Sequence, residues 1–140
     1  MIVVDSSAAV AILLGEPSSE ALLEVLAGDP IRIMSVANYL ETGTVLAERR
    51  TSTPEAAIAD LDAFLAEAGI DLAPVDAEQA RLALRARVRY GRGMGHGGTL
   101  NFGDCFAYAL ARSRGAKLLF VGDDFHTTDI LPATKPAGAA

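Results

Sequence analysis

The chain has 140 residues, of which 51% are hydrophobic and 21% charged, and its formal net charge at pH 7 is −6. This length and composition favour a single compact domain with an apolar core and exclude a disordered chain. An acidic balance taken alone disfavours nucleic acid as a partner, and the longest apolar run, residues 8–14, falls far short of the roughly 20 residues of a membrane span.

The sequence predicts an alternation of apolar strands and helices, with capping residues such as Ser35 and Asp76 before helices and glycines such as Gly69 after them. In chain order we expect a strand over 1–5, helices over 6–14 and 17–27, a strand over 31–34, helices over 36–50 and 54–68, a strand over 70–73, a helix over 76–90, a loop over 91–101, a helix over 102–114 and a strand over 117–121. Residues 132–140, rich in Ala, Gly and Pro, are expected to be a flexible tail behind a single domain of residues 1–131.

Apolar strands separated by helices indicate an α/β fold with a mainly parallel sheet of about four strands and helices on both faces. In such folds ligand chemistry gathers outside the carboxyl ends of the strands. Asp5 ends the first predicted strand, and Asp123 and Asp124 follow the last. The topology therefore places acidic groups at one edge of the sheet.

Two further carboxylates stand in apolar helical settings. Glu41 shares a helical stripe with apolar neighbours, and Asp104 lies in the segment LNFGDCFAYALA, where no helix rotation leaves it on a broad polar face. An unpaired buried carboxylate costs several kcal/mol or becomes protonated, and acids brought together repel one another. A divalent cation such as Mg²⁺ or Mn²⁺, which prefers oxygen ligands, removes both problems.

Each acid also has a simpler explanation. Asp5 and Asp104 can cap their own helices, and Glu41 can pair with a distant arginine. Three separate explanations would all have to apply, in a fold that already brings acids to one edge of the sheet. A single acidic metal site explains the whole pattern and is therefore favoured.

The segments MIVVDSSAAVAILLGEP, SVANYLET, LNFGDCFAYALA and KLLFVGDDFHTTDI, in this order, resemble a PIN-domain ribonuclease of the VapC toxin type over nearly the whole chain. The resemblance implies a PIN-like three-layer α/β fold and assigns Asp5, Glu41 and Asp104 to the acids around the metal. It places the fourth acid in GDDF, where we take Asp123 as the first candidate and Asp124 as the second.

The resemblance also implies supporting roles and partners. Ser7 matches a position that often carries a small hydroxyl near the metal, although it can equally be a plain helix cap. Asn101 and Asp129 are expected to support the site, Asp129 by bracing the terminal loop. The implied activity is Mg²⁺-dependent (or Mn²⁺-dependent) hydrolysis of RNA phosphodiester bonds by an endoribonuclease, using water activated by the metal. The implied partners are a VapB-like antitoxin and a second copy of the chain, as a homodimer.

Arginines gather between Glu78 and Asp104, where no acidic residue intervenes. Arg85, Arg89 and Arg92 are therefore candidates for contact with RNA or antitoxin, the simpler reading being a solvated helix face. Cys105 is the single cysteine, so an intrachain disulfide is excluded, and a reducing cytoplasmic compartment is expected.

Other assignments are weaker. Residues 93–98 match G-x-G-x-x-G in letters but follow a helix rather than a strand, which argues against a dinucleotide site. Phosphatases of the haloacid dehalogenase type carry a D-x-D motif after the first strand. This sequence has Ser7 in place of the second acid, which argues against such a phosphatase. The remaining alternative is a catalytically weak PIN-like module that binds RNA or protein.

Overall fold

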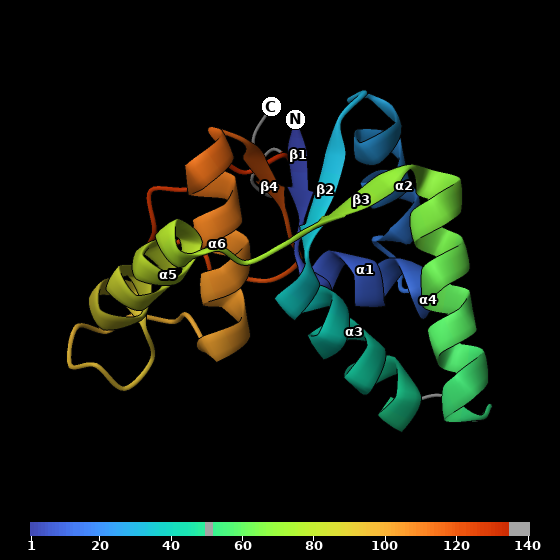
Figure 1. Ribbon diagram of the computed structural model, residues 1–140, viewed down its shortest axis with the longest axis horizontal. Coiled ribbons are helices and arrows are strands. Elements are labelled where there is room, and N and C mark those ends of the chain that lie inside the picture. The colour runs from blue at the N-terminus through green and yellow to red at the C-terminus, as the bar shows by residue number, and fades with distance from the viewer. Residues whose placement is uncertain (50–51, 135–140) are drawn as a thin grey trace.

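The structure is a computed structural model, and it describes residues 1–49 and 52–134. Strands and helices alternate in the predicted order (Figure 1). The elements are β1 (Ile2–Val4), α1 (Ser6–Leu13), α2 (Ser19–Ala27), β2 (Arg32–Ser35), α3 (Val36–Arg49), α4 (Pro54–Ala68), β3 (Ile70–Ala73), α5 (Ala77–Tyr90), α6 (Phe102–Arg114) and β4 (Lys117–Leu119).

The four strands form one parallel sheet in the order β3-β2-β1-β4, which confirms the predicted α/β architecture. β1 lies in the interior of the sheet, with Val3 opposite Ile33 of β2 and opposite Leu118 of β4. Because β1 and β4 run in the same direction, the residues that follow them, Asp5 and the loop beyond Leu119, emerge at the same edge.

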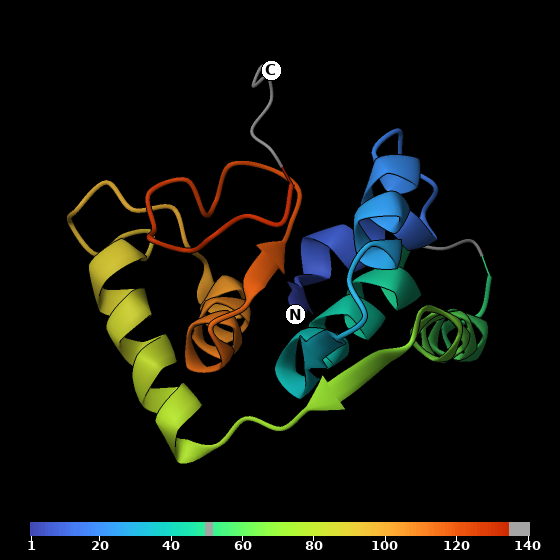
Figure 2. The ribbon, with the colours of Figure 1, turned by 90° about the horizontal axis from the view of Figure 1, so that it is seen from above.

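Two hydrophobic cores lie on the two faces of the sheet, and side chains along each strand alternate between them as the pleat requires. Val3 and Leu118 pack with α5 and α6, whereas Val4 and Leu119 pack with α1, α2 and α4. Figure 2 shows this division, with α5 and α6 on one side of the sheet and the helices α1–α4 on the other. The apolar residues of β1 and β4 are buried because helices cover both faces of the sheet at these strands.

Some boundaries differ from the prediction. β4 ends at Leu119 rather than at residue 121, because the backbone N–H of Val121 donates to the Ser7 hydroxyl (3.0 Å) instead of continuing the ladder. α2 begins at Ser19 instead of Pro17, after a turn in which the N–H of Ser19 donates to the carbonyl of Glu16 (2.9 Å). The predicted last residue of the third helix, Arg50, lies outside the described residues.

The chain end lies beside β4 as far as it is described. The N–H of Ala133 donates to the carbonyl of Leu118 (2.8 Å), so residues 132 and 133 are held against the sheet at this point. The rest of the predicted tail, residues 135–140, lies outside the described residues. Across the described part of the chain, no helix has the length and apolar character needed to cross a bilayer.

Candidate functional site

A pocket of about 360 Å³ opens where β1 and β4 end. Its lining comes from residues that are distant in sequence but meet at the carboxyl edge of the sheet and at the start of α6. The lining residues are Asp5, Ser6, Ser7, Val10, Glu16, Glu41, Val45, Arg49, Asn101, Asp104, Val121 and Asp124. Most of the acids chosen from the sequence, together with Ser7 and Asn101, therefore border one volume.

Asp5 sits at the end of β1 and caps α1, and only 2% of it is exposed. Its Oδ2 accepts hydrogen bonds from the Ser7 N–H (3.0 Å) and the Ser7 hydroxyl (2.6 Å). Its other oxygen, Oδ1, is buried without a hydrogen-bond partner among the described residues. The helix cap therefore accounts for one carboxylate oxygen and leaves the other without a structural role.

Ser7 links the two strand ends that frame the pocket. Its hydroxyl donates to Asp5 and accepts from the N–H of Val121, in the loop after β4. Both bonds fix the rotation of the hydroxyl and the position of the Asp5 carboxylate. Ser7 is thus a brace for Asp5 as well as a residue in the first turn of α1.

Glu41 reaches the pocket from the second turn of α3, where a buried amide holds it. The Nδ2 of Asn38, one turn earlier, donates to Glu41 Oε1 (3.3 Å) and to the carbonyl of Gly103 at the start of α6 (3.0 Å). The backbone carbonyl of Asn38 accepts from the Ser6 hydroxyl (3.2 Å). Asn38 therefore ties α1, α3 and α6 together beside the acid.

Gly103 has a packing reason to be glycine. A Cβ built at this position would overlap the carboxylate of Glu41, so any larger residue has to displace that side chain. The absence of a side chain lets Glu41 approach the first turn of α6, where the exposed N–H groups of a helix favour negative charge.

Asp104 is 7% exposed and forms a capping box with Asn101 at the start of α6. The Asn101 N–H donates to Asp104 Oδ2 (3.0 Å), and the Asp104 N–H donates to Asn101 Oδ1 (3.0 Å). The helix-capping explanation and the site explanation thus both apply, because capping engages one oxygen of a carboxylate that also lines the pocket.

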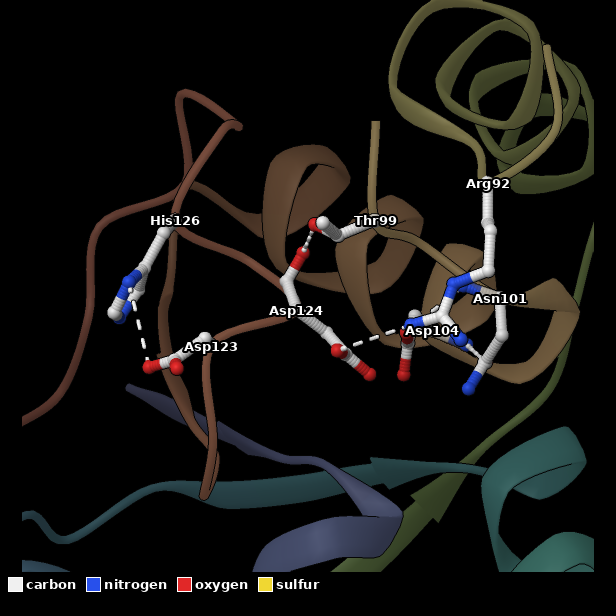
Figure 3. A network of polar contacts seen from close by, with 7 residues as sticks. All are labelled: Arg92, Thr99, Asn101, Asp104, Asp123, Asp124 and His126. Atoms are coloured by element: carbon white, nitrogen blue, oxygen red, sulfur yellow. Dashed lines mark hydrogen bonds and ion pairs between the residues drawn. The ribbon is translucent and has the colours of Figure 1, made fainter. Parts of the chain in front are cut away.

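The two neighbouring aspartates after β4 point in different directions, as Figure 3 shows. Asp124 lines the pocket on the side of Asp104, and its carboxylate lies 3.8 Å from the Arg92 guanidinium. The side chain of Asp123 is 91% exposed and lies 3.6 Å from the His126 imidazole. Asp123 is not among the described residues that line the pocket, so the geometry favours the second candidate, Asp124, as the fourth acid.

The carboxylates interact electrostatically. Burial raises the pKa of Asp5 to about 6, the hydrogen bonds from Ser7 oppose this shift, and the charge of Glu41 adds to it. Burial also raises the pKa of Asp104 well above its usual range, the Asn101 N–H opposes the shift, and the charges of Asp5 and Asp124 add to it. The pocket therefore disfavours negative charge unless a cation enters it.

The donor set fits a hard divalent cation. Carboxylate oxygens are the ligands that Mg²⁺ and Mn²⁺ prefer, and the buried Oδ1 of Asp5 lacks any other partner among the described residues. Within residues 1–49 and 52–134, no three His, Cys, Asp or Glu side chains already lie in an arrangement that would hold a metal ion. The acids line the pocket wall without converging on one point.

Sequence reasoning missed several residues of this region. Glu16 and Arg49 also line the pocket, and Asn38 supports it from the buried side. The only sequence signal for Asn38 was its polar side chain one helical turn before Glu41. Its contact with Gly103, 65 residues away, could not be predicted from local sequence.

The other predicted residues lie outside the pocket. Asp129 accepts a hydrogen bond from the Tyr108 hydroxyl (2.5 Å) and lies 3.7 Å from the Arg112 guanidinium, so it braces the loop after β4 against α6. Arg85 and Arg89 are exposed on α5 and are not among the described residues that line this pocket, whereas Arg92 lies at its rim beside Asp124.

Comparisons with known proteins identify the family of the chain. The model of the PIN domain family matches residues 2–131. Ribonuclease VapC of Mycolicibacterium smegmatis is 48% identical over 128 residues, which cover 91% of this chain and 96% of that protein. Ribonuclease VapC42 of Mycobacterium tuberculosis is 46% identical over 131 residues, covering 94% and 98%.

Solved structures share the fold at lower identity. The crystal structure of Mycobacterium tuberculosis VapC20, a sarcin-ricin loop cleaving toxin, superposes with a TM-score of 0.76 at 21% identity, covering 97% of this chain and all of that one. VapBC2 from Rickettsia felis, bound to a DNA fragment from its promoter, gives 0.70 at 20% identity, covering 94% and 96%.

A parallel α/β sheet with a carboxylate-lined pocket at its edge, matched by the family model over residues 2–131, places the chain in the PIN domain family. Within that family, the identity and coverage of its relatives show that it belongs to the VapC ribonucleases.

Proposed function

We propose that this protein is a divalent-metal-dependent endoribonuclease, the toxin of a VapBC-type toxin–antitoxin pair, and that Mg²⁺ or Mn²⁺ is its cofactor. One observation carries the proposal: five carboxylates border one pocket, and one of them keeps a buried oxygen without a partner among the described residues. Four of these acids, from four separate segments, are the ones to which we assign roles: Asp5, Glu41, Asp104 and Asp124.

Each acid has a role that follows from its position. Asp5, Asp104 and Asp124 would hold the cation, because helix caps fix the first two and the loop after β4 presents the third. Glu41, held by Asn38 through Oε1, is placed to orient a water molecule and accept its proton at the carboxylate. Arg49 and Arg92 at the pocket wall and rim offer positive charge to an RNA phosphate.

The bound cation would supply Lewis-acid polarisation of the phosphodiester and lower the pKa of water. The chain supplies the rigid frame for that chemistry. The Ser7 hydroxyl and the Asn101 N–H donate to the carboxylates of Asp5 and Asp104, so these two acids are positioned before RNA arrives.

The activity is tested with purified protein and total RNA in Mg²⁺ or Mn²⁺, with EDTA as the control. We expect cleavage that EDTA abolishes and that Asp104→Asn lowers by at least about a hundredfold, because the variant removes a charged ligand while Asn still fits the helix cap. A folded parent protein that binds RNA but does not cut it with either metal would instead favour a catalytically weak binding module.

The fourth acid is tested with the adjacent pair of aspartates. Asp124→Asn and Asp123→Asn remove the same charge one residue apart, but only Asp124 borders the pocket. We expect a large loss of cleavage for Asp124→Asn and a small one for Asp123→Asn. A larger loss for Asp123→Asn than for Asp124→Asn would instead make Asp123 the fourth acid of the site.

We further propose an antitoxin partner, a homodimeric assembly and a cytoplasmic location. A toxin–antitoxin complex from Klebsiella pneumoniae has the same fold, with a TM-score of 0.69 at 14% identity, and supports the first of these. Co-expression with the product of a neighbouring short gene is expected to yield a complex that copurifies and suppresses cleavage. Light scattering of the free chain gives its oligomeric state, and a monomeric mass would refute the dimer.

A further inference from the structure

A second polar pocket, of about 310 Å³, lies between the end of α5, the glycine-rich loop 91–101 and the loop after β4. It differs from the first pocket in charge, because none of the described residues that line it is acidic. The lining residues are Arg89, Tyr90, His96, Gly98 and Thr127.

The second pocket is a neighbour of the acidic one, because the same two loops border both. The Thr99 hydroxyl donates to the backbone carbonyl of Asp124 (2.6 Å), and Arg92 lies 3.8 Å from the carboxylate of the same residue (Figure 3). Thr127 follows Asp124 by three residues, and Gly98 precedes Thr99. Figure 2 shows the loops side by side. A strand of RNA crossing the acids therefore has this pocket next to it.

Arg89 is held in place by aromatic packing. Its guanidinium carbon lies 5.2 Å from the centre of the Tyr90 ring, and Tyr90 in turn packs against Tyr108 of α6 at 5.8 Å. Within the described ranges Arg89 forms no ion pair, so its charge is not neutralised by a carboxylate. A guanidinium fixed on an aromatic face, with its charge available, is suited to phosphate recognition.

We propose that this second pocket binds a backbone phosphate of the RNA, next to the one that is cut, with Arg89 as its main cationic contact and His96 and Thr127 as further donors. The inference rests on the proposed function, since it adds a binding position to that same reaction. Such a contact positions the strand without reading its sequence, because every nucleotide carries a phosphate.

The location of the second pocket also bears on how an acidic protein can bind RNA. The chain carries a net charge of −6 and its acidic pocket repels a polyanion, so RNA needs cationic contacts beside the acids. Arg89 in the second pocket provides such a contact where the two loops meet. The RNA can bind to it without neutralising the carboxylates that the reaction needs.

The test uses an oligoribonucleotide spanning a cleavage site mapped on total RNA. For Arg89→Gln we expect KM to rise by roughly tenfold, because the variant loses one charge-assisted hydrogen bond to the RNA. We expect little change in kcat. In the catalytically inactive Asp104→Asn background, the slope of log K against log salt is expected to fall by about 0.7, as for one phosphate contact on a single strand. Arg89→Lys keeps the charge and should restore most of the slope.

The matched control is Arg114→Gln, which removes the same charge at the far end of α6, before β4 and thus at the opposite edge of the sheet. An equal effect of Arg89→Gln and Arg114→Gln on KM and slope overturns the inference, because it leaves only non-specific attraction. Cleavage by the parent with an unchanged KM for Arg89→Gln also overturns it while the proposed function stands. A parent that does not cleave RNA refutes the proposed function and this inference together.

Discussion

Replacing Asp5 with asparagine is expected to stabilise the metal-free protein while abolishing cleavage. Asn still accepts the Ser7 hydrogen bonds as a helix cap, so the substitution mainly removes the charge. Burial raises the pKa of Asp5 from 3.8 to about 6. At about 1.4 kcal/mol per pKa unit, the charged carboxylate lowers the free energy of unfolding by about 3 kcal/mol at pH 8.

The pH dependence has a defined sign. The pKa of Asp5 is higher in the folded state than in the unfolded chain, so the penalty is complete above pH 6 and disappears as the pH falls below about 4. The parent should therefore gain stability relative to Asp5→Asn on acidification. The difference between the two proteins is expected to shrink by about half between pH 8 and pH 5.

The assay is urea denaturation of both proteins in EDTA at these two pH values. A saturating divalent cation should then stabilise the parent more than the variant, because it binds the folded state through the charge that the variant lacks. If Asp5→Asn is less stable than the parent in EDTA at pH 8, the carboxylate is not a strained metal ligand but a structural cap, and the reasoning is refuted.

Three other substitutions probe the frame of the site. Asn38→Ala removes the donor to Glu41 and should lower kcat by about tenfold to a hundredfold, with a smaller change in KM; an unchanged kcat in steady-state cleavage assays would show that Glu41 needs no such support. Gly103→Ala should leave the thermal unfolding midpoint at or above that of the parent, because Ala favours helices by up to about 1 kcal/mol, yet slow cleavage by displacing Glu41; full activity would mean that Glu41 moves without consequence. Tyr108→Phe should cost about 1 kcal/mol in urea denaturation through the lost hydrogen bond to Asp129, with kcat unchanged; a loss of activity at normal stability would bring Asp129 into the reaction.

The fold was predictable because its signals are local. Short strands between helices, such as Ile70–Ala73, and helix boundaries such as Thr53 before Pro54 or Gly69 after Ala68 reflect short-range rules, and the structure confirms them. The edge that collects the acids follows from topology alone, because parallel strands end on the same side. Asp5 and the acids after β4 could thus be placed at one edge before any coordinates were known, whereas Asp104 was assigned from its apolar helical setting and from the family resemblance.

The direction of a side chain in a loop was not predictable in this way. Asp123 and Asp124 are adjacent and chemically identical, and their difference depends on how the chain turns after β4, where the N–H of Val121 bonds to Ser7, 114 residues earlier. The contact between Asn38 and Gly103 is likewise a tertiary one. Such details depend on packing between elements, which periodicity does not encode.

The central claim is that carboxylates from separate segments form one cation site. A crystal soaked with Mn²⁺ and examined by anomalous scattering tests it most directly. We predict a peak within bonding distance of Asp5 Oδ1 and of the carboxylate of Asp104, with Asp124 beside it. A Mn²⁺ peak at Asp123 and His126 instead, with Asp5 Oδ1 still without a partner, would contradict the account.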